Sequence, residues 1–139
     1  MRFWDSSAVV ALLVDDPRHR RSLARLEQDE AMLVWWATPV ECISALARRE
    51  REGAMSADGF AIASGRLRTL AEQWHEVLPT NAVRSVAERM LRIHALRAAD
   101  ALQLAAATIA AERDPPSLEL VSLDERLNEA ASKEGFRIA

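Results

Sequence analysis

The chain has 139 residues, 50% of them hydrophobic and 28% charged, with a formal net charge of −3. This length and balance predict one globular domain over residues 1–139 and exclude a disordered or membrane-spanning chain, because no apolar run approaches the roughly 18 to 20 residues of a bilayer span. The acidic charge argues against broad nucleic-acid binding, and the single cysteine, Cys42, excludes an internal disulfide or a cysteine-based metal cage.

No signal peptide is recognisable at the N-terminus, because Asp5 interrupts the opening apolar stretch. We therefore expect a cytoplasmic protein.

Short apolar runs alternate with segments of helical periodicity in the first half of the chain. These patterns predict a strand at Phe3 and Trp4, a helix over 8–14, a charged helix over 17–29, a strand over 32–36, and helices from Thr38 to about Gly53 and over 56–70.

The second half continues the alternation. It predicts an edge strand over 74–78, helices over 81–94 and 98–111, a strand over 118–123, a helix over 124–133 and a short strand over 136–138. Strands that alternate with helices predict an α/β fold, here a three-layer sandwich with a short, mostly parallel sheet flanked by α-helices.

Four acidic residues stand just past predicted strands or on an apolar helix face: Asp5, Glu41, Asp100 and Asp124. Asp5 and Asp124 can each simply cap the helix that follows. For Asp5 alone, the capping and functional interpretations are about equally favoured. A capping box around Asp124 would also explain that residue without any chemistry.

Glu41 also has an ordinary structural explanation. Thr38 is the expected N-cap, Pro39 the first helical residue, and Glu41 stands at the third helical position, where it would close a capping box.

Asp100 is harder to explain structurally, because the surrounding residues 98–107 are almost wholly apolar. A carboxylate on such a face needs a hydrogen-bond donor or a cation, and Arg97 is the only neighbour in sequence that supplies one.

Taken together, the four carboxylates predict a site for a hard cation. Helix N-termini favour the ionised form of an acid, and the mutual repulsion of several carboxylates recruits Mg²⁺ or Mn²⁺, which prefer oxygen ligands. Such an ion supports phosphodiester hydrolysis. Asp5, Glu41 and Asp124 all follow predicted strands, and the carboxyl ends of strands in a doubly wound sheet form the ligand crevice.

Four segments in order resemble the PIN-domain toxins of the VapC family. Residues 3–13 (FWDSSAVVALL) resemble the family's opening, and residues 38–50 (TPVECISALARRE) its glutamate-bearing helix. Residues 96–107 (LRAADALQLAAA) are similar to the central aspartate motif, and residues 121–131 (VSLDERLNEAA) to the last one. Each motif alone is weak, whereas four in the right order and spacing are fairly specific.

This resemblance implies a PIN-like sandwich and Mg²⁺-dependent endonucleolytic cleavage of RNA, with Mn²⁺ as an alternative ion. Asp5 and Asp100 would be the main metal ligands, Glu41 and Asp124 would complete the acidic cluster directly or through water, and a metal-bound water would be the nucleophile. It also implies a cognate antitoxin that blocks the site, and frequent homodimers. Gln103 departs from the histidine often found three residues after the central aspartate, so no role is carried over to it.

Two other functions stay open at this stage. A phosphatase with Asp5 as nucleophile usually has a second acid two residues on, where this chain has Ser7. In a non-catalytic α/β binding module, all four carboxylates would be structural. Near the end of the third predicted helix, Arg48, Arg49 and Arg51 form a basic patch, which we interpret first as an ordinary basic helix end.

Overall fold

The computed structural model describes residues 1–139 and contains one five-stranded sheet in the order β3-β2-β1-β4-β5. The strands are β1 (Arg2–Trp4), β2 (Met32–Trp35), β3 (His75–Val77), β4 (Glu119–Val121) and β5 (Arg137–Ile138). All neighbouring strands are parallel, and β3 is an edge strand as expected. The fourth strand is shorter than predicted because its neighbour β1 ends at Trp4, which pairs with Val121.

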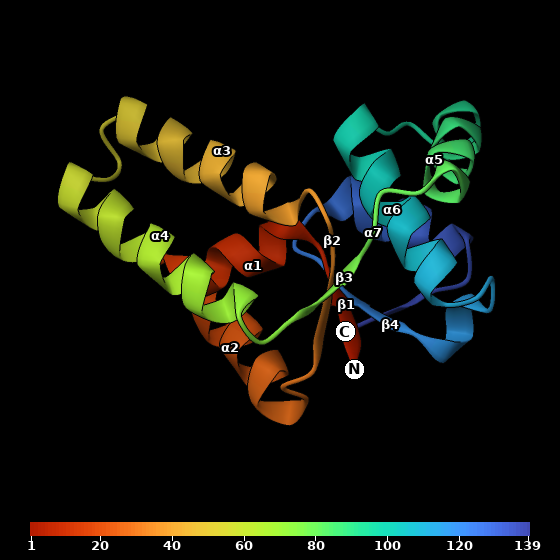
Figure 1. The fold of residues 1–139 in the computed structure, drawn as a ribbon, viewed down its shortest axis with the longest axis horizontal. Helices are drawn as coiled ribbons and strands as arrows, with labels where there is room; N and C mark the ends of the chain where they lie inside the picture. Colours follow the sequence, from red (N-terminus) through yellow and green to blue (C-terminus); the bar gives the residue numbers. More distant parts are fainter.

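Seven α-helices cover the sheet, and Figure 1 shows them in two groups on either side of the strands. One group comprises α1 (Ser6–Leu13), α2 (His19–Gln28), α3 (Thr38–Arg51) and α4 (Ala57–Ala71). The other comprises α5 (Asn81–Ile93), α6 (Ala98–Ala110) and α7 (Glu125–Lys133), with a short 3-10 helix at Pro115–Ser117. The predicted three-layer α/β architecture is confirmed. None of the helices is both long and apolar enough to cross a bilayer.

Side chains of the central strand alternate between two hydrophobic cores. Phe3 packs with α5, α6 and α7, while Trp4 packs with the helices of the first group. Leu120 and Val121 of β4 divide between the two cores in the same way. Successive residues of a strand face opposite sides of the sheet, so β1 and β4 each pack against both helical layers. This packing fixes the positions of the carboxyl ends of the two strands.

The predicted capping box at the start of α3 is wrong. Ala37 is the N-cap, and no side chain caps the helix. Thr38 is the first helical residue, and its hydroxyl oxygen accepts a hydrogen bond from Gln103 Nε2 of α6 at 3.1 Å. Glu41 is therefore free to make other contacts.

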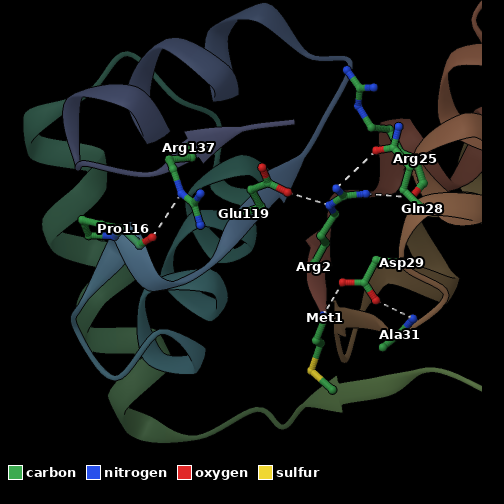
Figure 2. A network of polar contacts seen from close by, with 9 residues as sticks. All are labelled: Met1, Arg2, Arg25, Gln28, Asp29, Ala31, Pro116, Glu119 and Arg137. Carbon is green, nitrogen blue, oxygen red and sulfur yellow. Dashed lines mark hydrogen bonds and ion pairs between the residues drawn. The ribbon is translucent and has the colours of Figure 1, made fainter.

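The amino-terminal end of the sheet is held by Arg2 (Figure 2). Arg2 Nε donates to Glu119 Oε2 on β4 at 2.6 Å, and Arg2 Nη1 donates to the Arg25 carbonyl at 2.8 Å. The terminal amine contacts Asp29, which also accepts from the Ala31 amide. This network joins β1, β4 and the end of α2 at the edge opposite the strands' carboxyl ends.

We expect Arg2→Gln to lower the free energy of unfolding by about 1 to 2 kcal/mol, because it breaks a partly buried ion pair and leaves Glu119 and a helix carbonyl without their donor. Urea denaturation measures the change. The matched control is Arg137→Gln, whose exposed side chain donates only to the Pro116 carbonyl and whose loss should change stability by about 0.5 kcal/mol or less. Equal effects of the two substitutions would contradict a stabilising role for the Arg2 network.

Candidate active site

The candidate site lies where β1 and β4 end side by side. From β1 the chain continues to β2 on one side of the sheet, and from β4 it continues to β5 on the other. This is the topological switch point of a doubly wound sheet, where a crevice forms beyond the carboxyl ends of the strands. Asp5 follows β1 directly, and its amide donates to the Val121 carbonyl of β4 at 3.0 Å.

Asp5 is a buried carboxylate with one oxygen fully engaged. Its Oδ2 accepts from the Ser7 amide at 3.1 Å, from the Ser7 hydroxyl at 2.5 Å and from the Ser122 hydroxyl at 3.1 Å. The side chain caps α1, so the capping interpretation is correct in geometry. None of these bonds uses Oδ1, which leaves that oxygen available to a ligand.

Glu41 is held by side chains from the helices on either side of it. Its Oε2 accepts from the Ser6 hydroxyl of α1 at 3.0 Å, and its Oε1 accepts from Gln103 Nε2 of α6 at 3.2 Å. Gln103 is completely buried and bridges Glu41 to Thr38. The carboxylate is therefore oriented from both helical layers.

Asp100 and Asp124 lie at the starts of α6 and α7. Asp100 is in the first turn of α6. Asp124 is the N-cap of α7, where it accepts from the Leu127 amide at 3.0 Å, while its own amide donates to the Ser122 hydroxyl. The Ser122 hydroxyl contacts both Asp5 and Asp124, so it links the ends of β1 and β4 to the start of α7.

All four predicted carboxylates line one open cleft of about 830 Å³. The structure thus brings together Asp5, Glu41, Asp100 and Asp124, which are far apart in the sequence. They line the cleft without forming a closed cage, since no three acidic, histidine or cysteine side chains stand close enough to surround an ion.

Burial and mutual repulsion raise the pKa values of three of these acids. Burial is the main cause for Asp5, with a smaller contribution from the charge of Asp100. Burial, followed by the charges of Asp5 and Asp100, raises the pKa of Glu41 to about 7. Burial and the nearby Asp124 raise the pKa of Asp100, which Arg97 and Arg126 partly offset. A divalent cation in this cleft would relieve the repulsion.

The family model of the PIN domain matches residues 2–133. The chain belongs to the PIN-domain family. PIN domains are typically nucleases that use divalent metal ions. No curated protein matches this PIN domain in a search by sequence.

Solved structures share the fold of this PIN domain at low sequence identity. A structure of FitAcB from Neisseria gonorrhoeae has a TM-score of 0.66 and 17% identity and covers 99% of this chain and 96% of that chain. VapC20 from Mycobacterium tuberculosis, described as a Sarcin-Ricin loop cleaving toxin, has a TM-score of 0.65 and 21% identity, covering 98% and 96%. A toxin-antitoxin complex from Klebsiella pneumoniae has a TM-score of 0.63 and 14% identity, covering 89% and 87%.

The residues of this PIN domain fit a hard divalent ion. The carboxylates offer only oxygen donors, and Asp5 Oδ1 has no hydrogen-bond partner. Mg²⁺ keeps several of its waters and takes only one or two carboxylates directly, so it needs no closed protein cage. The open cleft therefore suits Mg²⁺ better than a metal that demands four protein ligands.

Sequence reasoning missed the residues that position the acids. Gln103 received no role, although it is the only polar residue besides Asp100 within residues 98–107 and stands three residues later, on the same side of the helix. The hydroxyls that orient the carboxylates belong to Ser6, Ser7 and Ser122. Their positions within two residues of Asp5 or Asp124 in the sequence could have indicated this role. Arg126, a second cation near Asp100, was also missed because it is distant in the sequence.

We expect the metal-free protein to lose stability as the pH rises from about 5 to about 8. Folding raises the pKa of Glu41 from 4.5 to about 7. Between these values the folded state keeps a proton that the unfolded state has lost, so the free energy of unfolding falls as the pH rises, until the folded state loses that proton as well. Thermal midpoints in EDTA measure this slope. Glu41→Gln should flatten it, and Mg²⁺ should raise the midpoint more at pH 8 than at pH 6. A slope that Glu41→Gln leaves unchanged would contradict this assignment.

Gln103→Leu should raise the pKa of Glu41 above 7, because it removes a donor to a carboxylate that stays largely buried. The pH midpoint of Mn²⁺ binding, followed by calorimetry, should therefore move upward. Thr38→Val is the control, since it removes the other partner of Gln103 and leaves the bond to Glu41. Equal midpoints in wild type and Gln103→Leu would show that Gln103 does not tune Glu41.

Proposed function

We propose that this protein is a Mg²⁺-dependent endoribonuclease and the toxin of a toxin–antitoxin pair, with Mn²⁺ as an alternative ion. One observation carries the proposal: four carboxylates of a PIN domain line a single cleft at the switch point of the sheet. They are the four residues that the sequence motifs selected.

Asp5 and Asp100 would be the direct metal ligands, and Glu41 and Asp124 would complete the acidic cluster directly or through water. When bound, Mg²⁺ lowers the pKa of water and neutralises charge on a phosphate, which is the chemistry of phosphodiester hydrolysis. Asp5 is suited to its part because Ser7 and Ser122 hold one oxygen and leave the other free.

Neighbouring side chains would keep Glu41 oriented toward the cleft, and Glu41 itself would hold or release a proton. Ser6 and Gln103 fix both oxygens of Glu41, so the carboxylate cannot rotate away from the cleft without breaking two hydrogen bonds. With a pKa of about 7 in the metal-free protein, Glu41 can hold or release a proton at neutral pH.

The names of the structural relatives support the choice of substrate and partner. One relative is a Sarcin-Ricin loop cleaving toxin, and another is a toxin-antitoxin complex. By analogy, we propose RNA as the substrate and a cognate antitoxin that blocks the cleft. A homodimer and a cytoplasmic location belong to the same proposal and rest on the resemblance to VapC toxins.

The phosphatase alternative is less well supported. A second acid is expected two residues after the nucleophile, whereas Ser7 stands there and donates its hydroxyl to Asp5. The non-catalytic binding module is separated from the proposal by the following experiment.

The purified protein, free of any antitoxin, should cleave a pool of cellular RNA in Mg²⁺ or Mn²⁺ and not in EDTA. Asp5→Asn and Asp100→Asn should each reduce cleavage at least about 100-fold, because each removes a negative oxygen ligand. Gel analysis of the RNA and calorimetry of metal binding give the two readouts.

Asp58→Asn is the matched control, since Asp58 lies in the first turn of α4 as Asp100 lies in the first turn of α6, but away from the cleft. Its activity should equal that of wild type. Folded protein that neither binds metal nor cleaves RNA would overturn the proposal in favour of the binding module. Metal binding with release of phosphate from small phosphate esters, and no RNA cleavage, would favour the phosphatase.

A further inference from the structure

The acidic centre lies in the main cleft, and a second hollow of the surface adjoins it at Asp100 and Asp124. The main cleft extends from it along α3, and the second hollow, of about 600 Å³, extends toward the start of α7. Ala99, Asp100 and Asp124 line both. An extended ligand can therefore run from one hollow to the other and pass over the carboxylates at its middle.

Arginines line the first hollow. Arg18 and Arg49 are both paired with Asp16, at 3.0 Å and 3.2 Å, which holds their guanidinium groups beside the cleft. Arg48 lines the same cleft and forms no ion pair and no side-chain hydrogen bond. Its guanidinium is free to bind an anion. The three arginines of the basic patch on α3 therefore differ: Arg49 is paired with Asp16, Arg48 is unpaired in the cleft, and Arg51 lines neither hollow.

The second hollow also has free arginines, Arg97 and Arg126. Arg97 directly precedes α6, and Arg126 lies in the first turn of α7. A helix start disfavours a cation, so the helix dipole does not explain either residue. Neither arginine forms an ion pair or a side-chain hydrogen bond, although acidic side chains are close by. Both guanidinium groups are exposed, and their N–H donors have no acceptor within the protein.

We propose that Arg48 on one side and Arg97 with Arg126 on the other form two phosphate subsites, which bind a single RNA strand across the acidic centre. This inference rests on the proposed ribonuclease function and adds the path of the substrate. Arginine suits the task because its planar fork matches phosphate oxygens.

This arrangement solves an electrostatic problem of the site. Four carboxylates repel the phosphate backbone of RNA, and the chain as a whole carries a net charge of −3. Cations placed before and after the acidic centre offset that repulsion where the neighbouring phosphates would lie, so no basic excess of the whole protein is needed.

The test uses the full chain, a single-stranded RNA of about 12 nucleotides, and the variants Arg48→Gln and Arg126→Gln. Each variant should raise KM roughly three- to tenfold, and Arg48→Gln should leave kcat nearly unchanged. Each variant should also reduce the slope of log KM against log salt by about 0.7, the value for one lost phosphate contact on a single strand. The control is Arg84→Gln on α5, which removes the same charge from an exposed arginine outside both hollows and should change neither quantity.

A parallel binding assay keeps the two proposals distinguishable. Fluorescence anisotropy of the same RNA, in an Asp100→Asn background that does not cleave, measures the subsites without catalysis. Weaker binding after the Arg48 or Arg126 substitution, with no cleavage by wild type, would support the subsites and overturn the ribonuclease. Cleavage with unchanged KM and salt slope, or an equal effect of Arg84→Gln, would overturn the subsites and leave the ribonuclease standing. Protein that neither binds nor cleaves the RNA would overturn both.

Discussion

The burial of Asp5 between the ends of β1 and β4 is the constraint around which the site is built. A carboxylate that is 3% exposed is costly unless donors surround it, and three hydrogen bonds to Oδ2 meet that requirement. Two of these bonds come from Ser7 in α1 and one from Ser122 after β4. The same contacts that make the buried charge tolerable therefore fix the geometry of the candidate metal ligand.

The other acids extend this arrangement into both helical layers. Glu41 lies on α3 in one layer and is bound by Gln103 of α6 in the other, while Asp100 and Asp124 lie at helix starts on the same side of the sheet as Gln103. Capping and chemistry do not exclude each other here. Asp5 and Asp124 cap their helices with one oxygen and still line the cleft. The candidate site is thus built on the ends of helices and strands, which suits an arrangement of several like charges.

Charge is distributed to serve two opposing needs. For the function that we propose, the acids must lie close enough to bind a cation, although burial and then mutual repulsion raise their pKa values in its absence, and the proposed substrate is itself an anion. Asp16 resolves part of this conflict by holding Arg18 and Arg49 at the cleft, and the unpaired arginines in both hollows supply further cations. A net negative protein can in this way present local phosphate-binding sites.

Sequence patterns alone predicted the α/β sandwich, nearly all helices and strands, and the four acids that meet in the cleft. The spacing of apolar residues along the chain indicates which face of each helix or strand is buried. An acid that directly follows a strand of a parallel sheet lies at the edge of the sheet where the strands' carboxyl ends meet. The contacts of each acid were decided by tertiary structure. Local reasoning assigned Glu41 to a capping box with Thr38, whereas in the structure Gln103 of α6 reaches the start of α3 and hydrogen-bonds to both residues. Arg126 could not be linked to Asp100 from the sequence, because only the packing of α6 and α7 in one layer brings the starts of these two helices together. Residue type and local pattern determined which groups this chain carries, and long-range packing determined which of them touch.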